Sequence, residues 1–170
     1  MDLIGALIEC GAVKFGDFTL KSGRRSQYYI DIKVAETKWE ILNEICDRIL
    51  PFVYGNKLAG VELGAIPIVV GVALKSNKDY IIIRKERKDY GTARRYEGTI
   101  ERGDKFTIIE DVVTTASSVL RAAEIIEEEG GIVENIVAVV DREEGGRENI
   151  ENRGYEFNAI ITVEELLKRR

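Results

Sequence analysis

The residues best suited to chemistry lie between Phe106 and Ser118, where an apolar run gives way to acids and then to small and hydroxyl residues. Glu110 and Asp111 follow the apolar run directly, and a helical pattern begins at Ser117. The segment therefore predicts a buried strand, a short polar loop and a helix, with two carboxylates at the end of the strand.

The loop after the two acids has the composition of a phosphate site. The start of a helix offers unpaired backbone N–H groups and a partial positive charge, and both favour a bound phosphate. Small residues let a phosphate approach the backbone, while hydroxyl groups add hydrogen-bond donors. The residues expected to form this site are Val112, Val113, Thr114, Thr115, Ala116, Ser117 and Ser118.

The two carboxylates cannot bind phosphate themselves. Glu110 and Asp111 can accept hydrogen bonds from sugar hydroxyls, or lie near a magnesium ion that the ligand carries. Acids beside a phosphate site therefore indicate a sugar phosphate. The alternative interpretation is an ordinary acidic turn followed by a helix that Ser117 caps. Neither GxGxxG nor GxxxxGK[ST] occurs, which excludes the usual dinucleotide and P-loop sites.

Composition removes several other kinds of chemistry. The 170 residues include no histidine, which excludes Ser-His-Asp and Cys-His catalysis and every histidine-ligated metal. Cys10 and Cys46 lie in separate apolar segments and are expected to be buried free thiols in a reducing compartment. A net charge of −5 argues against nucleic-acid binding by the chain as a whole.

The sequence predicts a single cytoplasmic domain, 1–170, that binds no membrane. Met1 to Val13 lacks the basic start and cleavage site of a signal peptide. The longest apolar run, Ala65 to Leu74, is too short to cross a bilayer. No internal repeat or linker interrupts the chain.

The elements that must position the acids are expected to form an α/β domain. A helix at 1–12 and a hairpin at 18–34 come first, and Thr37 is expected to cap a helix at 37–54. Apolar strands are predicted at 57–61, 80–84, 105–109, 135–140 and 157–163, with helices at 66–74 and 117–129 and a short helix at the end of the chain. Such strands are typical of a parallel sheet covered on both faces, which binds ligands at the carboxyl ends of its strands.

The segment Ile108 to Val119 resembles the signature with which type I phosphoribosyltransferases bind phosphoribosyl pyrophosphate (PRPP): apolar residues, two acids, two apolar residues, threonine, small residues and hydroxyls. Ala116 stands where a glycine is typical. The resemblance implies the type I fold, a central, mostly parallel sheet flanked by helices with a small N-terminal hood or hairpin region. It also implies that residues 110–118 bind PRPP, with Mg²⁺ held mainly through PRPP near Glu110 and Asp111.

The hairpin narrows the choice of substrate. Phe18 to Asp31 is similar to the N-terminal signature of orotate phosphoribosyltransferases, Phe-x-Leu-x-Ser-Gly followed by a serine and an aromatic pair. This resemblance implies that Lys21 reaches PRPP, and that Tyr29, Ile30 and Thr114 line the orotate pocket. Without the resemblance, the interpretation favoured would be an exposed hairpin with a basic turn.

A basic stretch follows the strand at 80–84, since six of the twelve residues from 84 to 95 are Lys or Arg. The irregular segment to Asp104 is long enough to favour a functional lid, whereas a solvated charge run or nucleic-acid patch is the alternative. Resemblance to the orotate enzymes implies a hood loop, about 85–104, that acts across the interface of a homodimer. It brings Arg84, Lys85, Lys88 and Tyr90 to PRPP, with Tyr90 where many members have histidine.

Two further segments resemble the same family. Gly60 to Pro67 is similar to its pyrophosphate loop, with Leu63-Gly64 where bacterial members often carry Tyr-Lys. Arg142 matches the arginine that binds the orotate carboxylate, and a guanidinium is the natural bidentate partner of a carboxylate. A surface ion pair with its acidic neighbours is the alternative for Arg142.

The resemblance spans about 15–147 and implies an orotate phosphoribosyltransferase that uses PRPP, orotate and Mg²⁺. The reaction displaces pyrophosphate from the ribose C1 by positioning and electrostatics, so it requires no histidine. The catalytic residues it implies are Lys88, Arg84 and Asp111. A purine phosphoribosyltransferase is one alternative. A PRPP-sensing regulator that binds DNA is another, although residues 1–12 leave little room before the core for a DNA-binding segment.

Overall fold

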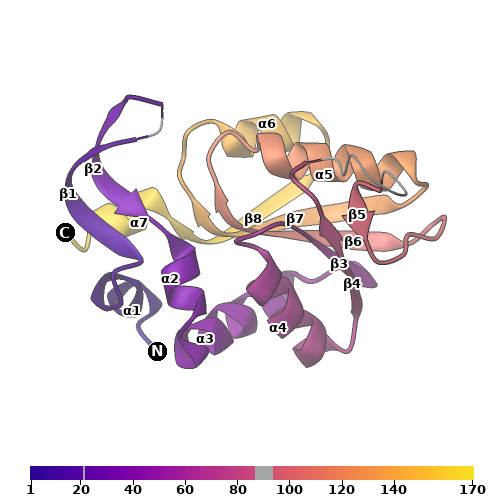
Figure 1. Ribbon diagram of the computed structural model, residues 1–170, viewed down its shortest axis with the longest axis horizontal. Coiled ribbons are helices and arrows are strands. Elements are labelled where there is room, and N and C mark those ends of the chain that lie inside the picture. The colour runs from indigo at the N-terminus through magenta and orange to yellow at the C-terminus, as the bar shows by residue number, and fades with distance from the viewer. Residues whose placement is uncertain (21, 87–93) are drawn as a thin grey trace.

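The computed structural model describes residues 1–20, 22–86 and 94–170. In this part of the chain a six-stranded sheet has the order β5-β4-β3-β6-β7-β8 (Figure 1). Its strands are β3 (Lys57–Val61), β4 (Asp79–Ile83), β5 (Tyr96–Glu97), β6 (Lys105–Val113), β7 (Ile132–Asp141) and β8 (Glu156–Thr162). Only β5 runs antiparallel to its neighbour, which confirms the mostly parallel sheet.

Helices cover both faces of this sheet. The two faces carry α3 (Trp39–Ile49) and α4 (Ile66–Ser76) on one side, and α5 (Ser117–Glu128) and α6 (Gly146–Asn152) on the other. Successive strand residues point to opposite faces, so β3, β6 and β7 each supply both hydrophobic cores. Leu58, Ile109 and Val137 pack in the core of α3 and α4, whereas their neighbours Ala59, Ile108 and Ile136 pack in the core of α5.

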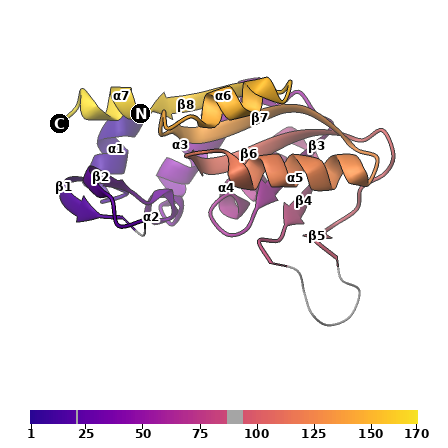
Figure 2. The ribbon, with the colours of Figure 1, turned by 90° about the horizontal axis from the view of Figure 1, so that it is seen from above.

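The N-terminal residues form a small region of their own. Its elements are α1 (Leu3–Glu9), the antiparallel strands β1 (Val13–Thr19) and β2 (Arg25–Ile30), and α2 (Ile32–Glu36). Figure 2 shows this region at the end of the sheet where β8 leads into α7 (Val163–Leu167). The hairpin and α2 therefore stand beside the carboxyl ends of the parallel strands.

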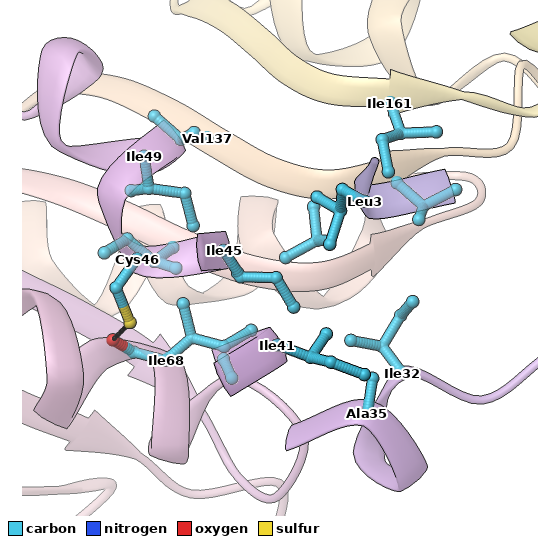
Figure 3. Close-up of a cluster of buried hydrophobic side chains, with 14 of the residues drawn as sticks. Leu3, Ile32, Ala35, Ile41, Ile45, Cys46, Ile49, Ile68, Val137 and Ile161 are labelled. Carbon is cyan, nitrogen blue, oxygen red and sulfur yellow. Dashed lines mark hydrogen bonds between the residues drawn. The ribbon is translucent and has the colours of Figure 1, made fainter. Parts of the chain in front are cut away.

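One of the two cysteines, Cys46, lies in the core that α3 and α4 share. Ile45, Cys46 and Ile49 point from α3 toward Ile68 and Val137 (Figure 3). The Cys46 thiol is buried and donates to the Ile68 carbonyl at 3.7 Å, and burial raises its pKa to about 11. Both cysteines are free, as expected, but Cys10 is only partly buried.

The predicted helix at 37–54 is wrong at its start. Thr37 ends α2 instead of capping α3, because its backbone is helical and its hydroxyl donates to the Val34 carbonyl at 2.8 Å. Helix α3 begins at Trp39 without a side-chain cap, and a 3₁₀ turn (Leu50–Phe52) follows it. The helix predicted at 1–12 is also shorter, since Asp2 caps it and it ends at Glu9.

Strand bounds differ from prediction where pairing with a neighbour decides them. β6 was expected to end at Ile109, but it runs to Val113 because Val112 and Val113 pair with Val140 and Asp141 of β7. β1 begins at Val13, five residues before the predicted arm at Phe18. β5, which pairs with the edge of β4, lies within a stretch expected to be irregular. In the described residues no helix is both long and apolar enough to span a membrane.

Candidate functional site

Two adjacent acids in the second half of β6 lie in different environments. Glu110 is only 6% exposed, and its Oε1 accepts from the Asp111 N–H at 3.1 Å. Burial, followed by the hydrogen bond and charge of Asp111, raises the pKa of Glu110 well above its ordinary value. Asp111 is more open, and its Oδ1 accepts from the Val112 N–H at 2.9 Å. Asp111 is therefore the acid that is available to a ligand.

A small hollow of about 130 Å³ lies between Glu110 and the start of α5. This volume equals that of about four liquid waters, which is room for a phosphate group. Ala116 occupies the N-cap position with a left-handed backbone (φ 70°, ψ 12°), and no side chain caps the helix. The alternative in which Ser117 caps α5 is therefore wrong, and the first N–H groups of the helix stay available. The hollow is lined by Glu110, Val112, Val113, Thr114, Thr115, Ala116, Ser117, Ser118 and Val119.

The loop that forms this hollow is held from behind by α6. Asn149 Nδ2 donates to the Thr115 carbonyl at 2.9 Å. Gly146 packs so close that a Cβ at its position would lie 2.7 Å from the Thr114 carbonyl oxygen. Sequence reasoning did not find these two supporting residues, because neither belongs to a ligand-binding pattern.

A second cavity of about 220 Å³ adjoins the hollow and shares Glu110, Val112 and Ser118 with it. The Glu62–Leu63 peptide bond at its wall is cis, and Glu62 Oε1 accepts from the Lys85 N–H at 2.8 Å. A ligand with a phosphate in the hollow can extend its other end into this cavity. The cavity is lined by Lys33, Val61, Glu62, Leu63, Gly64, Lys85, Glu110, Asp111, Val112 and Ser118.

The predicted basic residues differ in whether they line a cavity. Lys85 lines the second cavity, whereas Arg84 forms an ion pair with Glu97 of β5. Arg84 lines neither cavity in the described residues, and its buried Nε has no hydrogen-bond partner there. Predictions for Lys21, Lys88 and Tyr90 fall outside the described residues.

Two charged residues of α2 that the sequence did not single out lie near Asp111. Lys33 lines the second cavity. Glu36 is 7% exposed, and its Oε1 lacks a hydrogen-bond partner among the described residues. Burial, and then the charge of Asp111, raises the pKa of Glu36 to about 8. Only the fold reveals these residues, because α2 is far from β6 in the sequence.

Arg142, which follows the end of β7, faces the hairpin. Its guanidinium lies 5.3 Å from the centre of the Tyr28 ring, and its Nη2 pairs with Glu144 Oε1 at 3.0 Å. The ion pair considered as an alternative is therefore present. Both Tyr28 and Arg142 line a cavity of about 300 Å³, with Leu20, Arg24, Arg25, Ser26, Gln27, Glu144 and Leu167.

The tyrosine beside Arg142 is Tyr28, whereas Tyr29, a predicted contact to orotate, lies on the opposite side of β2. Alternation along β2 sends neighbouring side chains to opposite sides, so Tyr29 points away from Tyr28. Tyr29 is 43% exposed and packs against Phe18 with ring centres 5.8 Å apart. Ile30 is partly buried against the core of α3 and α4.

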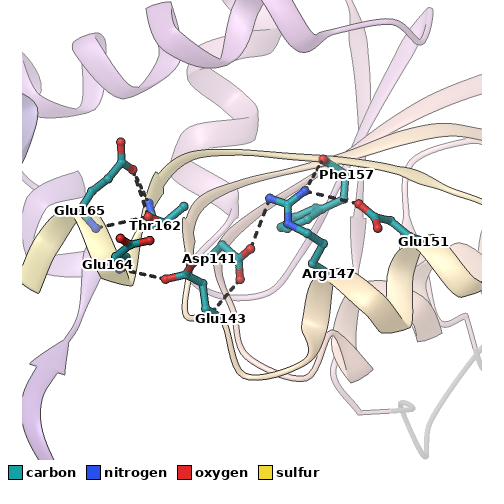
Figure 4. A network of polar contacts seen from close by, with 8 residues as sticks. All are labelled: Asp141, Glu143, Arg147, Glu151, Phe157, Thr162, Glu164 and Glu165. Carbon is teal, nitrogen blue, oxygen red and sulfur yellow. Dashed lines mark hydrogen bonds and ion pairs between the residues drawn. The ribbon is translucent and has the colours of Figure 1, made fainter.

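A polar network fixes the turn that carries Arg142 (Figure 4). Arg147 Nη2 pairs with Asp141 Oδ2 at 3.4 Å, and its Nη1 donates to the Phe157 carbonyl at 3.1 Å. Asp141 Oδ1 also accepts from the Glu143 N–H at 2.8 Å. The end of β7 is therefore tied to β8 and α6, which positions the residue between Asp141 and Glu143.

Comparison with known proteins extends these observations. No family model matches the chain. The chain is 49% identical over 160 residues to an orotate phosphoribosyltransferase of Picrophilus torridus, covering 94% of this chain and 96% of that protein. The solved structure of orotate phosphoribosyltransferase from Aeropyrum pernix matches with a TM-score of 0.88 and 31% identity, over 98% of this chain and 97% of that one. Leishmania donovani UMP synthase matches with a TM-score of 0.85 and 32% identity; 98% of this chain is covered, but only 37% of that longer one.

The sheet order, the acids in the second half of β6 and the phosphate-sized hollow define a type I phosphoribosyltransferase fold. Sequence identity carried across nearly the full length goes further than this shared fold. The chain belongs to the orotate phosphoribosyltransferase family. The resemblance seen in the 108–119 and 18–31 segments is thereby confirmed.

Proposed function

We propose that the protein transfers the ribose 5-phosphate group of PRPP to orotate, producing orotidine 5′-monophosphate and pyrophosphate in the synthesis of UMP. The observation that carries this proposal is the pair of adjoining cavities beside Asp111, one of which ends at the uncapped start of α5. Membership of the orotate enzyme family supports the choice of base. A cytoplasmic location is part of the proposal, supported by two free cysteines, which a reducing compartment preserves.

In the proposed reaction the orotate nitrogen attacks the ribose C1 as pyrophosphate leaves. The protein supplies no nucleophile, so its task is to position both reactants and to stabilise charge. The loop from Thr114 to Ser118 and the start of α5 hold the 5′-phosphate. Asp111 accepts hydrogen bonds from the ribose hydroxyls, and Lys85, Arg84 and Lys88 neutralise the departing pyrophosphate.

We assign Mg²⁺ to PRPP rather than to a cage of protein ligands. The described residues contain no group of three or more acids or cysteines that could hold a metal ion by themselves. The carboxylate of Asp111 at the second cavity nevertheless fits an ion already carried by phosphates, because Mg²⁺ is commonly bound through one or two carboxylates plus substrate phosphates. When bound, the ion would neutralise pyrophosphate charge.

Arg142 is proposed to bind the orotate carboxylate. Its guanidinium already pairs with a carboxylate, that of Glu144, and its buried Nε is left without a partner in the described residues. An incoming carboxylate can therefore accept from that Nε at once, and it completes a bidentate contact by competing with Glu144 for the guanidinium. The neighbouring Tyr28 ring offers an apolar face beside it, and Tyr29, Ile30 and Thr114 stay as proposed contacts to the base.

The direct test is to mix protein, orotate, PRPP and Mg²⁺ and to follow the fall in the ultraviolet absorbance of orotate. Turnover should require orotate, PRPP and Mg²⁺ together. Adenine, guanine and hypoxanthine offered in place of orotate should give no release of pyrophosphate. Pyrophosphate release with a purine but not with orotate would overturn the proposed function.

We also propose that the active form is a homodimer in which the hood loop, about 85–104, acts across the interface. The resemblance of the basic 84–95 stretch to the family supports this proposal. Lys88→Ala and Arg142→Ala should each be nearly inactive alone. Mixed after dissociation and reassociation, they should recover about a quarter of wild-type activity, because half of the dimers then hold one intact site of two. A mixture that stays inactive would place the hood in its own subunit.

A further inference from the structure

Lys33 is held at the start of α2 by a single acid. Its Nζ forms an ion pair with Asp31 Oδ1 at 2.8 Å, and the same oxygen accepts from the Lys33 backbone N–H at 3.2 Å. Asp31 is also the N-cap of α2, so one carboxylate fixes both the helix start and the ammonium group. The Lys33 side chain is 49% exposed, which leaves it accessible to a ligand.

The acids around Lys33 favour its charged form. The hydrogen bond to Asp31 raises its pKa, with further contributions from the charges of Asp31, Asp111 and Glu36 that outweigh partial burial. Lys33 is therefore an ammonium throughout the neutral range. Its charge faces a cavity and is not needed to neutralise a deeply buried partner.

Of the described residues that line the second cavity, only Lys33 and Lys85 carry positive charge. They come from separate elements, α2 and the segment that follows β4. The pyrophosphate-loop positions contribute no cation here, since Leu63 and Gly64 are uncharged. Among the acids on the walls, the raised pKa of Glu110 lessens its negative charge. Among the described lining residues, these two lysines are therefore the source of positive charge for a strongly anionic group in this cavity, apart from any metal that the group carries.

We propose that Lys33 binds the pyrophosphate group of PRPP and so belongs to the substrate-binding residues of this enzyme. The inference rests on the proposed function. The 5′-phosphate occupies the hollow at α5, and the second cavity shares three residues with that hollow. The pyrophosphate at the other end of the same molecule therefore enters the cavity where Lys33 stands. Asp31 acts as a positioning residue for the ammonium group.

The test is calorimetry with Mg²⁺ present, comparing wild type with Lys33→Met. We expect affinity for PRPP and for pyrophosphate to fall roughly tenfold, as for the loss of one charge-assisted contact. Affinity for ribose 5-phosphate, which lacks the pyrophosphate group, should change by less than about twofold. Lys33→Arg should restore most of the PRPP affinity because it keeps the charge, and Asp31→Asn should show an intermediate loss.

Lys75→Met is the matched control. Lys75 also forms an ion pair with an aspartate, Asp47, at 2.7 Å, but it lies on α4 and lines neither cavity. Its loss should leave all three affinities unchanged. Equal weakening of ribose 5-phosphate and PRPP by Lys33→Met, or unchanged PRPP and pyrophosphate binding, would overturn the role of Lys33. Failure of the wild type to bind PRPP at all would instead overturn the proposed function.

Discussion

Gly64 lies so close to Asp111 that a Cβ at position 64 would come within 2.1 Å of Asp111 Oδ2. The glycine belongs to the loop after β3, and the aspartate to β6. Absence of a side chain at position 64 therefore leaves room for the carboxylate that we propose to receive the ribose hydroxyls. The segment that resembles the family's pyrophosphate loop therefore leaves space for an acid of the neighbouring strand.

Gly64→Ala should displace the Asp111 carboxylate and lower kcat/KM by roughly tenfold to a hundredfold, since small misplacements of positioning groups have effects of that size. Steady-state kinetics with PRPP and orotate would measure it. Gly154→Ala is a suitable control, because Gly154 has a left-handed backbone (φ +87°) and nothing near its Cβ position. It should lower stability and leave kcat/KM per folded molecule unchanged. Full activity in Gly64→Ala would show that Asp111 tolerates another position.

Ala116 adopts the left-handed backbone that glycine more commonly takes at such a position. Ala116→Gly should therefore keep the loop and bind PRPP within about threefold of wild type, because glycine reaches φ 70° without steric cost. Ala116→Val should weaken PRPP binding by at least about tenfold, since a β-branched residue is a true outlier in this region. Calorimetry with PRPP and Mg²⁺ would measure both variants. Unimpaired binding by Ala116→Val would contradict the role of the loop backbone.

The parts of the fold that could be predicted are those with a local signal. Lys57–Val61 was expected as a strand and is one with the same bounds, because its apolar run is short and clearly ended. The join between β6 and α5 was expected from the same kind of signal. The extension of β6 to Val113 could not be predicted, because pairing with β7 decides it and that partner is 28 residues away in the register, as for Val113 and Asp141.

In the site too, residues with a local sequence signal could be predicted, and those placed by tertiary packing could not. Residues within one motif, such as Asp111 and Ser118, line the expected cavities. Lys33 was missed because its nearness to Asp111 depends on how α2 packs. Which tyrosine of the pair lies beside Arg142 depends on the phase of β2, which the aromatic pair alone does not set. Arg84 forms an ion pair with Glu97. Glu97 belongs to β5, a strand that the sequence did not predict.

Arg142→Lys should raise the KM for orotate by roughly tenfold to a hundredfold, because lysine cannot reproduce a bidentate contact with a carboxylate. The Kd of PRPP should stay the same. Arg153→Lys is the control, since Arg153 is an exposed arginine paired with Glu124 on the surface. Glu144→Gln should act in the opposite direction and lower the KM for orotate a few-fold, because it removes the carboxylate that now occupies Arg142. Parallel losses for orotate and PRPP in Arg142→Lys would argue for a structural role instead.

Glu36 should make the stability of the protein depend on pH. Burial, the charge of Asp111 and, more weakly, that of Asp31 raise its pKa from 4.5 to about 8, against the opposing charge of Lys33. Between these values the folded protein retains a proton that the unfolded chain has released, so the contribution of Glu36 to stability falls as pH rises through this window. The slope is about 1.4 kcal/mol per pH unit at most, and the total on the order of a few kcal/mol.

Glu36→Gln should therefore unfold at a higher denaturant concentration than wild type at pH 8, and the difference should shrink towards pH 5. Denaturation in metal-free buffer across this range would measure it, with Glu9→Gln, at an exposed position of α1, as the charge-matched control. Glutamine keeps the shape of the side chain but has no carboxyl to ionise beside Asp111. Wild-type and Glu36→Gln curves that run parallel from pH 5 to 8 would mean that Glu36 ionises in the folded protein as readily as in the unfolded chain.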